Sequence, residues 1–262
     1  MTVAAMLATV FALAAPQGSA AGSQTYVVLY KGTSVPADAR SNISRAGGEL
    51  VAAYGQIGVA IARSSNASFR DAIARDSRVE GASSTAKFAT KLNDVETETG
   101  NTSDADGPVD DGAEPLWGMQ WDMVQIRVPE AHEVTGGSSS VIVGDIDTGL
   151  DFTHPDLAPN YDASRSTDCT SGAPAPLGVG NDVDGHGTHT AGTIAAAANG
   201  IGIVGVAPNV KIAGIKSGND EGFFFPEAVI CGFMWAATHQ IDVTNNSYFA
   251  DPWLFNCRND AE

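Results

Sequence analysis

The sequence predicts an α/β protein in which a small βαββαβ unit precedes a larger, doubly wound and mostly parallel sheet. Strand-like and helix-like stretches alternate along both halves of the chain, and a polar, acidic stretch separates the halves. The 262 residues are 43% hydrophobic, which is enough apolar side chain to bury a core. We expect boundaries that give four segments: 1–21, 22–92, 93–114 and 115–262.

The first 21 residues have the pattern of a signal peptide. The run from Thr2 to Ala15 is almost wholly apolar, and the small residues from Gly18 to Ala21 follow it as a cleavage region. No positive charge precedes Val3, which is consistent with a misassigned start inside a longer signal. The alternative is a short membrane anchor, but the run is too short to span a bilayer comfortably. We therefore expect a secreted, extracellular protein with no membrane attachment after signal removal.

The segment 22–92 is expected to form the smaller, ferredoxin-like βαββαβ unit. Hydrophobic periodicity predicts strands at 26–30, 49–54, 57–62 and 79–83, with helices at 37–46 and 67–74. The following stretch from Asn93 to Glu114 combines acidic residues with Gly, Ser, Thr and Pro, and has no Lys or Arg. Such a composition cannot bury a core, so we expect an exposed, cleavable linker.

The segment 115–262 alternates strands with helices. A continuous apolar strand is predicted at 141–146, interrupted by Gly144 and Asp145, and a helix of small residues at 189–198. A second strand, helix and third strand follow at 210–215, 226–239 and 241–243. This alternation is typical of a parallel, doubly wound sheet.

Charge and cysteine content exclude some classes of partner. Fourteen Lys and Arg residues stand against 31 Asp and Glu residues, and the formal charge of -17 repels phosphate backbones and anionic membranes. We therefore expect no nucleic-acid partner. Cys169, Cys231 and Cys257 fit an exported protein with at most one disulfide, and their spacing is not that of a zinc site.

Two segments carry residues suited to catalysis. In the first, a buried strand ends in Asp147, Thr148 and Gly149, and the carboxyl ends of parallel strands are where ligand sites gather. In the second, Asp184-Gly-His186-Gly-Thr-His189, glycines permit a close approach while a small-residue helix begins at the histidines. This placement puts His186 at the helix entrance.

These two segments are similar, almost letter for letter, to the aspartate and histidine motifs of the subtilisin-like serine protease family. The matching residues are Ile146-Asp147-Thr148-Gly149 and His186-Gly-Thr-His189-Thr-Ala-Gly192. The family's chain order of Asp, His and Ser is a known template, so the order here is a check against it. The resemblance implies a precursor with a signal, an inhibitory propeptide at 22–92 and the first part of a catalytic domain at 115–262.

The resemblance also implies roles for individual residues. His186 would take a proton from a serine hydroxyl and return it to the leaving amine, Asp147 would hold the imidazole, and His189 would be structural. In the template the serine follows the histidine by about 150 residues, which lies beyond Glu262. We therefore expect this chain to be truncated before the nucleophile and to be inactive alone.

Further matches imply a substrate strand and a metal site. Ser247, Tyr248 and Phe249 fall in the segment that binds substrate as an extended strand, although the family usually has leucine and glycines there. Asp156 and Asn199 match positions that hold a structural calcium ion in several members. No cofactor is required for the chemistry.

The resemblance sets the expected partners as well. These are protein or peptide substrates and the intramolecular propeptide, in a protein that is otherwise a monomer. Asp145 departs from the family, which usually has a neutral residue there, and we expect it at the surface or behind the catalytic residues.

Three rival interpretations remain open at the level of sequence. An aspartic protease also uses Asp-Thr-Gly, but would need a second copy by dimerisation and no His motif. A zinc site could use His186 and His189 with Asp184 or His154, although no Glu stands between the histidines as a general base. The third is a non-catalytic chain, in which the propeptide-like unit and an inactive half-domain act as an inhibitor or folding assistant.

Overall fold

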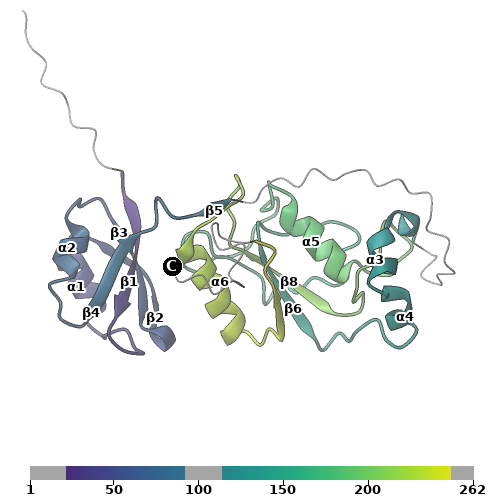
Figure 1. Ribbon diagram of the computed structural model, residues 1–262, viewed down its shortest axis with the longest axis horizontal. Helices are drawn as coiled ribbons and strands as arrows, with labels where there is room; N and C mark the ends of the chain where they lie inside the picture. Colours follow the sequence, from purple (N-terminus) through teal and green to yellow (C-terminus); the bar gives the residue numbers. More distant parts are fainter. Residues whose placement is uncertain (1–21, 92–113, 249–262) are drawn as a thin grey trace, which may run out of the picture.

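The computed structural model describes residues 22–91 and 114–248 (Figure 1). The expected signal peptide, nearly all of the expected linker, Phe249 and Cys257 lie outside these described residues. None of the helices within the two described ranges has the length and apolar character needed to cross a bilayer.

The first unit has the expected βαββαβ order. Its sheet is antiparallel in the order β2-β3-β1-β4, with both helices against one face (Figure 1). The core contains Val28, Ile43, Phe69 and Ile73, all at most 1% exposed. The elements are β1 (Gln24–Tyr30), α1 (Ala39–Arg45), β2 (Glu49–Tyr54), η1 (Gly55–Ile57), β3 (Val59–Ser64), α2 (Phe69–Ile73) and β4 (Val79–Ser84).

The second unit is built on a parallel sheet in the order β10-β6-β8-β7. Helices α5 and α6 lie on opposite faces of this sheet, as the doubly wound prediction requires, and the short helices α3 and α4 lie beyond α5 (Figure 1). The elements are η2 (Trp117–Met119), α3 (Trp121–Gln125), α4 (Val128–His132), β6 (Ile142–Asp147), β7 (Thr167–Asp168), α5 (His186–Ala195), β8 (Lys211–Lys216), α6 (Pro226–Thr238) and β10 (Val243–Asn245).

Several details differ from the sequence-based expectation, and three of them bear on the second sheet. Helix α5 begins at His186 rather than at residue 189, because Gly185 takes a φ of 91° and turns the chain into the helix there. The last strand lies at Val243–Asn245, two residues later than predicted, where it pairs with β6. The two-residue strand β7 was not predicted, since it is too short to show any alternation of apolar and polar side chains.

The first unit packs against α6 of the second. Tyr54, Val59 and Ile61 share one buried cluster with the Cys169–Cys231 disulfide, which ties the end of β7 to α6. The Tyr54 hydroxyl donates to the carbonyl oxygen of Gly172 at 2.7 Å. Beyond this contact, the chain leaves the first unit and adds a short strand, β5 (Thr90–Lys91), antiparallel to β9 (Phe223–Phe224) of the second.

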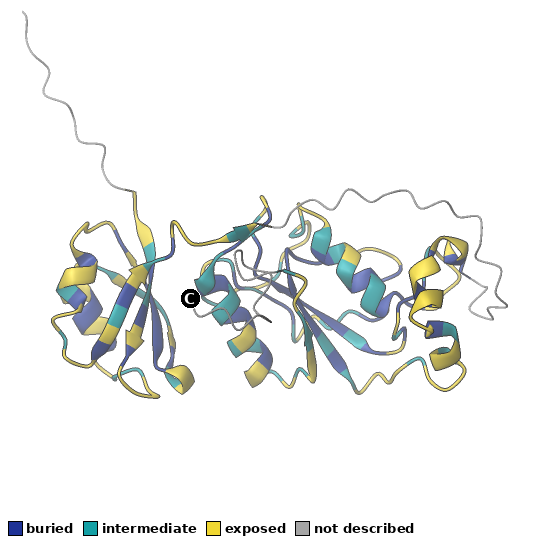
Figure 2. Ribbon diagram, viewed as in Figure 1, coloured by how far each residue is buried: buried dark blue, intermediate teal, exposed yellow. Residues whose placement is uncertain are grey.

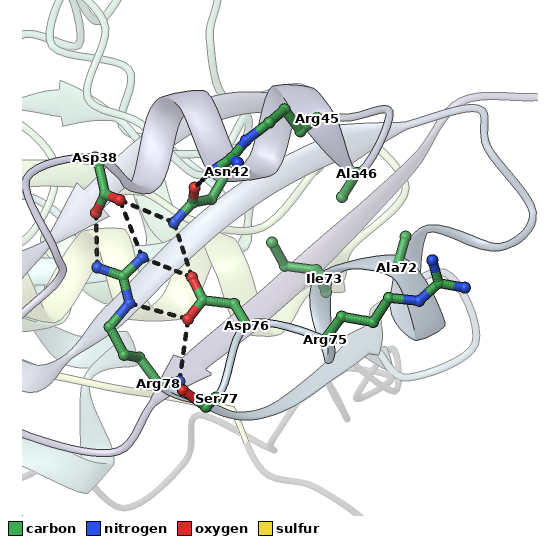
Figure 3. A pocket seen from close by; sticks show the side chains of 10 residues that line it. All are labelled: Asp38, Asn42, Arg45, Ala46, Ala72, Ile73, Arg75, Asp76, Ser77 and Arg78. Atoms are coloured by element: carbon green, nitrogen blue, oxygen red, sulfur yellow. Dashed lines mark hydrogen bonds and ion pairs between the residues drawn. The ribbon is translucent and has the colours of Figure 1, made fainter.

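Burial follows these layers. Strands β6 and β8 are buried along most of their length, whereas the outer faces of α1, α3 and α4 are exposed (Figure 2). At the far end of the first unit, a polar hollow contains an Arg78 guanidinium between the carboxylates of Asp38 and Asp76, with Asn42 beside them (Figure 3). These partly exposed ion pairs join α1 to the turn before β4 and have no catalytic neighbour.

Candidate functional site: an aspartate and a histidine at the end of β6

The structure brings Asp147 and His186 together at the carboxyl end of β6. His186 Nδ1 lies 2.8 Å from Asp147 Oδ1. The Asp147 side chain is fully buried, while that of His186 is 31% exposed. His186 Nε2 forms no hydrogen bond with a described residue, so this nitrogen is free to meet a reactant from solvent.

The close approach of α5 to β6 explains how the histidine reaches the aspartate. Gly187 N donates to Thr148 Oγ1 at 2.9 Å. A Cβ built on Gly187 would lie 2.1 Å from the Gly149 carbonyl oxygen, so only glycine allows this contact. Of the two glycines in the histidine motif, Gly187 therefore makes the close approach, while Gly185 contributes its positive φ.

Asp182 is a residue of this site that sequence reasoning missed. Its Oδ1 accepts hydrogen bonds from Thr148 Oγ1 at 2.8 Å and from Gly185 N at 3.0 Å. Its Oδ2 accepts from the backbone and hydroxyl of Thr188. The carboxylate thus satisfies free N–H groups at the start of α5, as a helix-capping side chain does. A carboxylate four residues before the first helical residue was the available signal.

Burial dominates the electrostatics of Asp147. Desolvation raises the pKa of its carboxyl group, while the hydrogen bond and charge of His186 and the Thr148 N–H lower it. Ser217 N and Gly218 N both donate to the Asp147 carbonyl oxygen and hold its backbone to β8. Asp147 Oδ2 is buried without a hydrogen-bond partner among the described residues. An imidazolium at His186 is the group that best compensates this buried charge.

The predicted substrate residues lie just after β10, next to β6. Ser247 Oγ accepts a hydrogen bond from Asn245 Nδ2 at 2.9 Å. The Tyr248 ring stacks on Phe224 of β9 with ring centroids 4.3 Å apart. Phe249 lies outside the described residues. Strand β9, which sequence reasoning did not single out, therefore adjoins the predicted substrate segment and already holds β5 as an extended partner.

The predicted metal residues lie together at a separate place, beyond the far end of α5. Asp156 is 3% exposed; its Oδ2 accepts from Ile203 N at 3.2 Å, and its Oδ1 has no hydrogen-bond partner in the part of the chain that the structure describes. Asn199 donates to the Pro155 carbonyl oxygen at 3.3 Å. Sequence reasoning missed Glu114, whose Oε1 accepts from Gly200 N at 2.8 Å and whose buried Oε2 has no hydrogen-bond partner in residues 22–91 and 114–248.

The other titratable residues of the two motifs are arranged differently. His189 is exposed on α5, beside a hollow that His154 and Asp156 also line. Within the described residues there is no group of three or more His, Cys, Asp or Glu side chains that could hold a metal ion. Asp145 is fully buried, so the expectation that it could lie at the surface is wrong.

Comparisons with known proteins agree with this geometry. The subtilase family model matches residues 138–251. Subtilisin E of Bacillus subtilis (strain 168) is 37% identical over 123 residues, which is 47% of this chain and 30% of subtilisin E. Fervidolysin of Fervidobacterium pennivorans is 37% identical over 145 residues, covering 53% of this chain and 20% of that protein.

A solved structure extends the likeness to most of the described chain. The crystal structure of fervidolysin, a keratinolytic enzyme related to subtilisin, superposes with a TM-score of 0.69 at 25% identity over 90% of this chain and 37% of that one. In the sequence comparison, the chain covers 30% of the length of subtilisin E and 20% of the length of fervidolysin, which is less than a third of each protein. The segment that matches the subtilase family of subtilisin-like serine proteases, residues 138–251, contains both Asp147 and His186.

Proposed function

We propose that this protein is an exported serine endopeptidase, made as a precursor, that hydrolyses peptide bonds through an acyl-enzyme. The observation that carries the proposal is the 2.8 Å contact between His186 Nδ1 and a fully buried Asp147 carboxylate. This is the base and orienting pair that serine protease chemistry requires. The acidic charge of -17 fits protein or peptide substrates in solution better than nucleic acid or anionic membranes.

In this proposal His186 acts through its free Nε2. This nitrogen takes the proton of a serine hydroxyl as the oxygen attacks the scissile carbonyl, and then gives it to the leaving amine. Asp147 holds the proton on Nδ1 and stabilises the imidazolium that forms. No serine within residues 22–91 or 114–248 hydrogen-bonds His186, so the proposal assigns the nucleophile to none of these.

Expression of the complete reading frame tests the proposal. We expect casein cleavage and covalent labelling by a serine-directed fluorophosphonate, and no inhibition by pepstatin. His186→Ala should abolish both signals. His189→Ala is the matched control, because this exposed histidine on the same helix does not contact Asp147 and its loss should leave cleavage intact. Cleavage that survives His186→Ala, or the absence of labelling, would overturn the proposal.

We also propose that the first unit is an intramolecular propeptide that inhibits the enzyme until it is removed. Support comes from β5, which lies as an extended strand against β9 beside the predicted substrate segment, and from the buried contact of Tyr54 with Gly172. The non-catalytic alternative, an inhibitor or folding assistant, uses the same surfaces.

Loss of the Tyr54 hydroxyl should weaken this inhibition. In the complete protein, Tyr54→Phe should shorten the lag before activity appears, because it removes a buried hydrogen bond between the units. Tyr26→Phe is the control, since the Tyr26 hydroxyl donates to Gln24 within the first unit. Equal lags in both variants would contradict the propeptide assignment.

A structural calcium ion is the third proposal, held by Asp156, Asn199 and Glu114. The unpartnered buried oxygens of Asp156 and Glu114 fit a hard cation that prefers carboxylate and amide oxygens. Added Ca²⁺ should raise the unfolding temperature of this chain, and Asp156→Asn should remove that response. Asp122→Asn, an exposed change on α3, should retain it. The same temperature with Ca²⁺ or with EDTA in the wild type would refute the site.

A further inference from the structure

Asp145 is a second buried carboxyl close to the proposed catalytic pair. It stands two residues before Asp147 on β6 and its side chain is fully buried. The pairing register places it opposite Asn245 of β10 on one side and opposite Gly214 of β8 on the other. Its hydrogen-bond partners are a hydroxyl and an amide rather than a cation, so nothing neutralises a charge there directly.

The carboxyl group joins three elements. Asp145 Oδ2 lies 2.7 Å from Thr190 Oγ1 on α5, one helical turn after His186. Asp145 Oδ1 accepts from Asn245 Nδ2 at 2.8 Å. The same amide of Asn245 reaches Ser247 Oγ at 2.9 Å, at the start of the predicted substrate segment. One buried side chain therefore ties the helix with His186 and the strand leading to Ser247 to the strand with Asp147.

The contacts of Thr190 fit a protonated Asp145. Thr190 Oγ1 lies 2.7 Å from Asp145 Oδ2 and also 3.0 Å from the Gly187 carbonyl oxygen. A hydroxyl has one proton to donate, so both hydrogen bonds form together only when Asp145 donates its own proton to Thr190. Burial raises the pKa of Asp145 to about 7, and the charge of Asp147 also raises it, against the effects of Asn245, Thr190 and His186.

Ionisation of Asp145 would disturb the pair in two ways. Thr190 would turn its proton from Gly187, beside His186, to Asp145. A second negative charge would also stand near Asp147 and His186. The third titratable neighbour is Tyr248 after β10, whose pKa is raised by burial and by the charges of Asp147 and Asp145. Opposite Asp145 on β8 stands a glycine, which adds no charge.

We propose that Asp145 is a positioning residue for the Asp147–His186 pair, which it holds in register by bridging β6 to Thr190 of α5 and Asn245 of β10. It does not touch a reactant itself. The kinetic consequence rests on the proposed protease function. The effect on the geometry of His186 does not, and can be measured on this chain.

The first experiment uses this chain and NMR of the histidine rings. The proton shared by His186 Nδ1 and Asp147 Oδ1 should give a downfield resonance, identified by its absence in His186→Ala. Asp145→Leu, which can neither accept nor donate, should remove this resonance. Asp145→Asn should keep it, because its amide can accept from Asn245 and donate to Thr190. Retention of the resonance in Asp145→Leu, or its loss in both variants, would overturn the proposal.

The second experiment uses the complete protease and a peptide substrate. Thr190→Val keeps the side-chain volume and should lower kcat at least tenfold with KM changed less than twofold. Thr193→Val is the control one turn further along α5, where the hydroxyl donates to the His189 carbonyl oxygen of the same helix, and it should match the wild type. Asp145→Asn should recover most of the kcat that Asp145→Leu loses.

The outcomes separate this inference from the proposed function. A wild-type protein without peptidase activity counts against the function, while the NMR result still decides the bridge. Should Asp145→Leu not fold, the NMR measurement on Thr190→Val and Thr193→Val replaces it. Equal kcat values for Thr190→Val and Thr193→Val in an active protease, or no rescue by Asp145→Asn, would refute the positioning role.

Discussion

Gly187 allows the tightest contact between α5 and the end of β6, and its substitution should displace His186. A Cβ at this position would lie 2.1 Å from the Gly149 carbonyl oxygen and 2.9 Å from Gly149 N. Both are backbone atoms, so no change of side-chain rotamer relieves the clash. Gly187→Ala should therefore push the first turn of α5 away from the strand and break the hydrogen bond to Thr148 Oγ1.

The magnitude can be worked from this geometry. Overpacking costs about 1–3 kcal/mol, and the lost hydrogen bond costs about 1 kcal/mol. Alanine returns about 1 kcal/mol through its better helix propensity. We expect a net loss of about 2 kcal/mol in the free energy of unfolding. Gly192→Ala on the same helix meets only Ile203 Cδ1 at 3.6 Å, and should instead gain about 0.5–1 kcal/mol.

Urea unfolding of this chain, followed by tryptophan fluorescence, measures both variants under one condition. The two changes are the same chemically, so opposite signs would isolate the close approach as the cause. In the complete protease, Gly187→Ala should also lower kcat because the imidazole moves. A Gly187→Ala variant as stable as the wild type would show that α5 does not need glycine there, and would refute the reasoning.

The remaining predictions concern charge and covalent links. The pKa of Asp145 is about 7 in the folded protein, against 3.8 for a free carboxyl. The contribution of Asp145 to the free energy of unfolding is therefore complete below about pH 4, and it is lost as the pH rises through 7. Asp145→Asn should gain up to about 4 kcal/mol over the wild type between pH 4 and 8.5 in urea unfolding, and a constant difference would contradict this. Burial between the two units raises the pKa of the Glu227 carboxyl group. Glu227→Gln should therefore slow the rate at which an added protease separates the first unit from the second above neutral pH, and should leave this rate unchanged at pH 4. Arg78 lowers the pKa of Asp76 to about 2, so Arg78→Ala should destabilise the first unit at pH 7 in urea unfolding, and should do so less in high salt or at pH 2. Cys231→Ala opens a disulfide with a sequence separation of 62 and should cost about 4 kcal/mol in thermal unfolding.

The fold was predictable wherever a single segment shows the hydrophobic periodicity of a strand or a helix. Strand β2 has the predicted bounds, and α6 differs from its prediction by one residue. The pairing of β5 with β9 could not be foreseen, since each strand has two residues and exists only through the other. The start of α5 depends on the positive φ of Gly185 and on capping by Asp182. Helical periodicity over small residues does not show such a boundary.

The residues of the candidate site also fall into those that the sequence identified and those that it missed. Asp147 and His186 stand in motifs that match those of a known family, so the sequence alone identified both residues as catalytic candidates. Glu114 acts through a side chain that accepts from the distant backbone of Gly200, and no local pattern marks such a long-range hydrogen bond. Asp182 accepts from Thr188, which is near it in the sequence, so its place just before α5 was a signal that could have been used.

Asp145 and Asp147 have different environments because two residues along β6 span about the same distance as four residues along α5. Two residues of β6 advance about 6.6 Å, and four residues of α5 advance about 6 Å. Since Asp147 meets His186 and Asp145 meets Thr190, the helix runs back along the strand and its i, i+4 pair faces the strand's i, i+2 pair. One carboxylate therefore receives an imidazole and the other a hydroxyl. A shift of one residue in α5 would separate both pairs at once, so Asp145 can act on His186 without touching it.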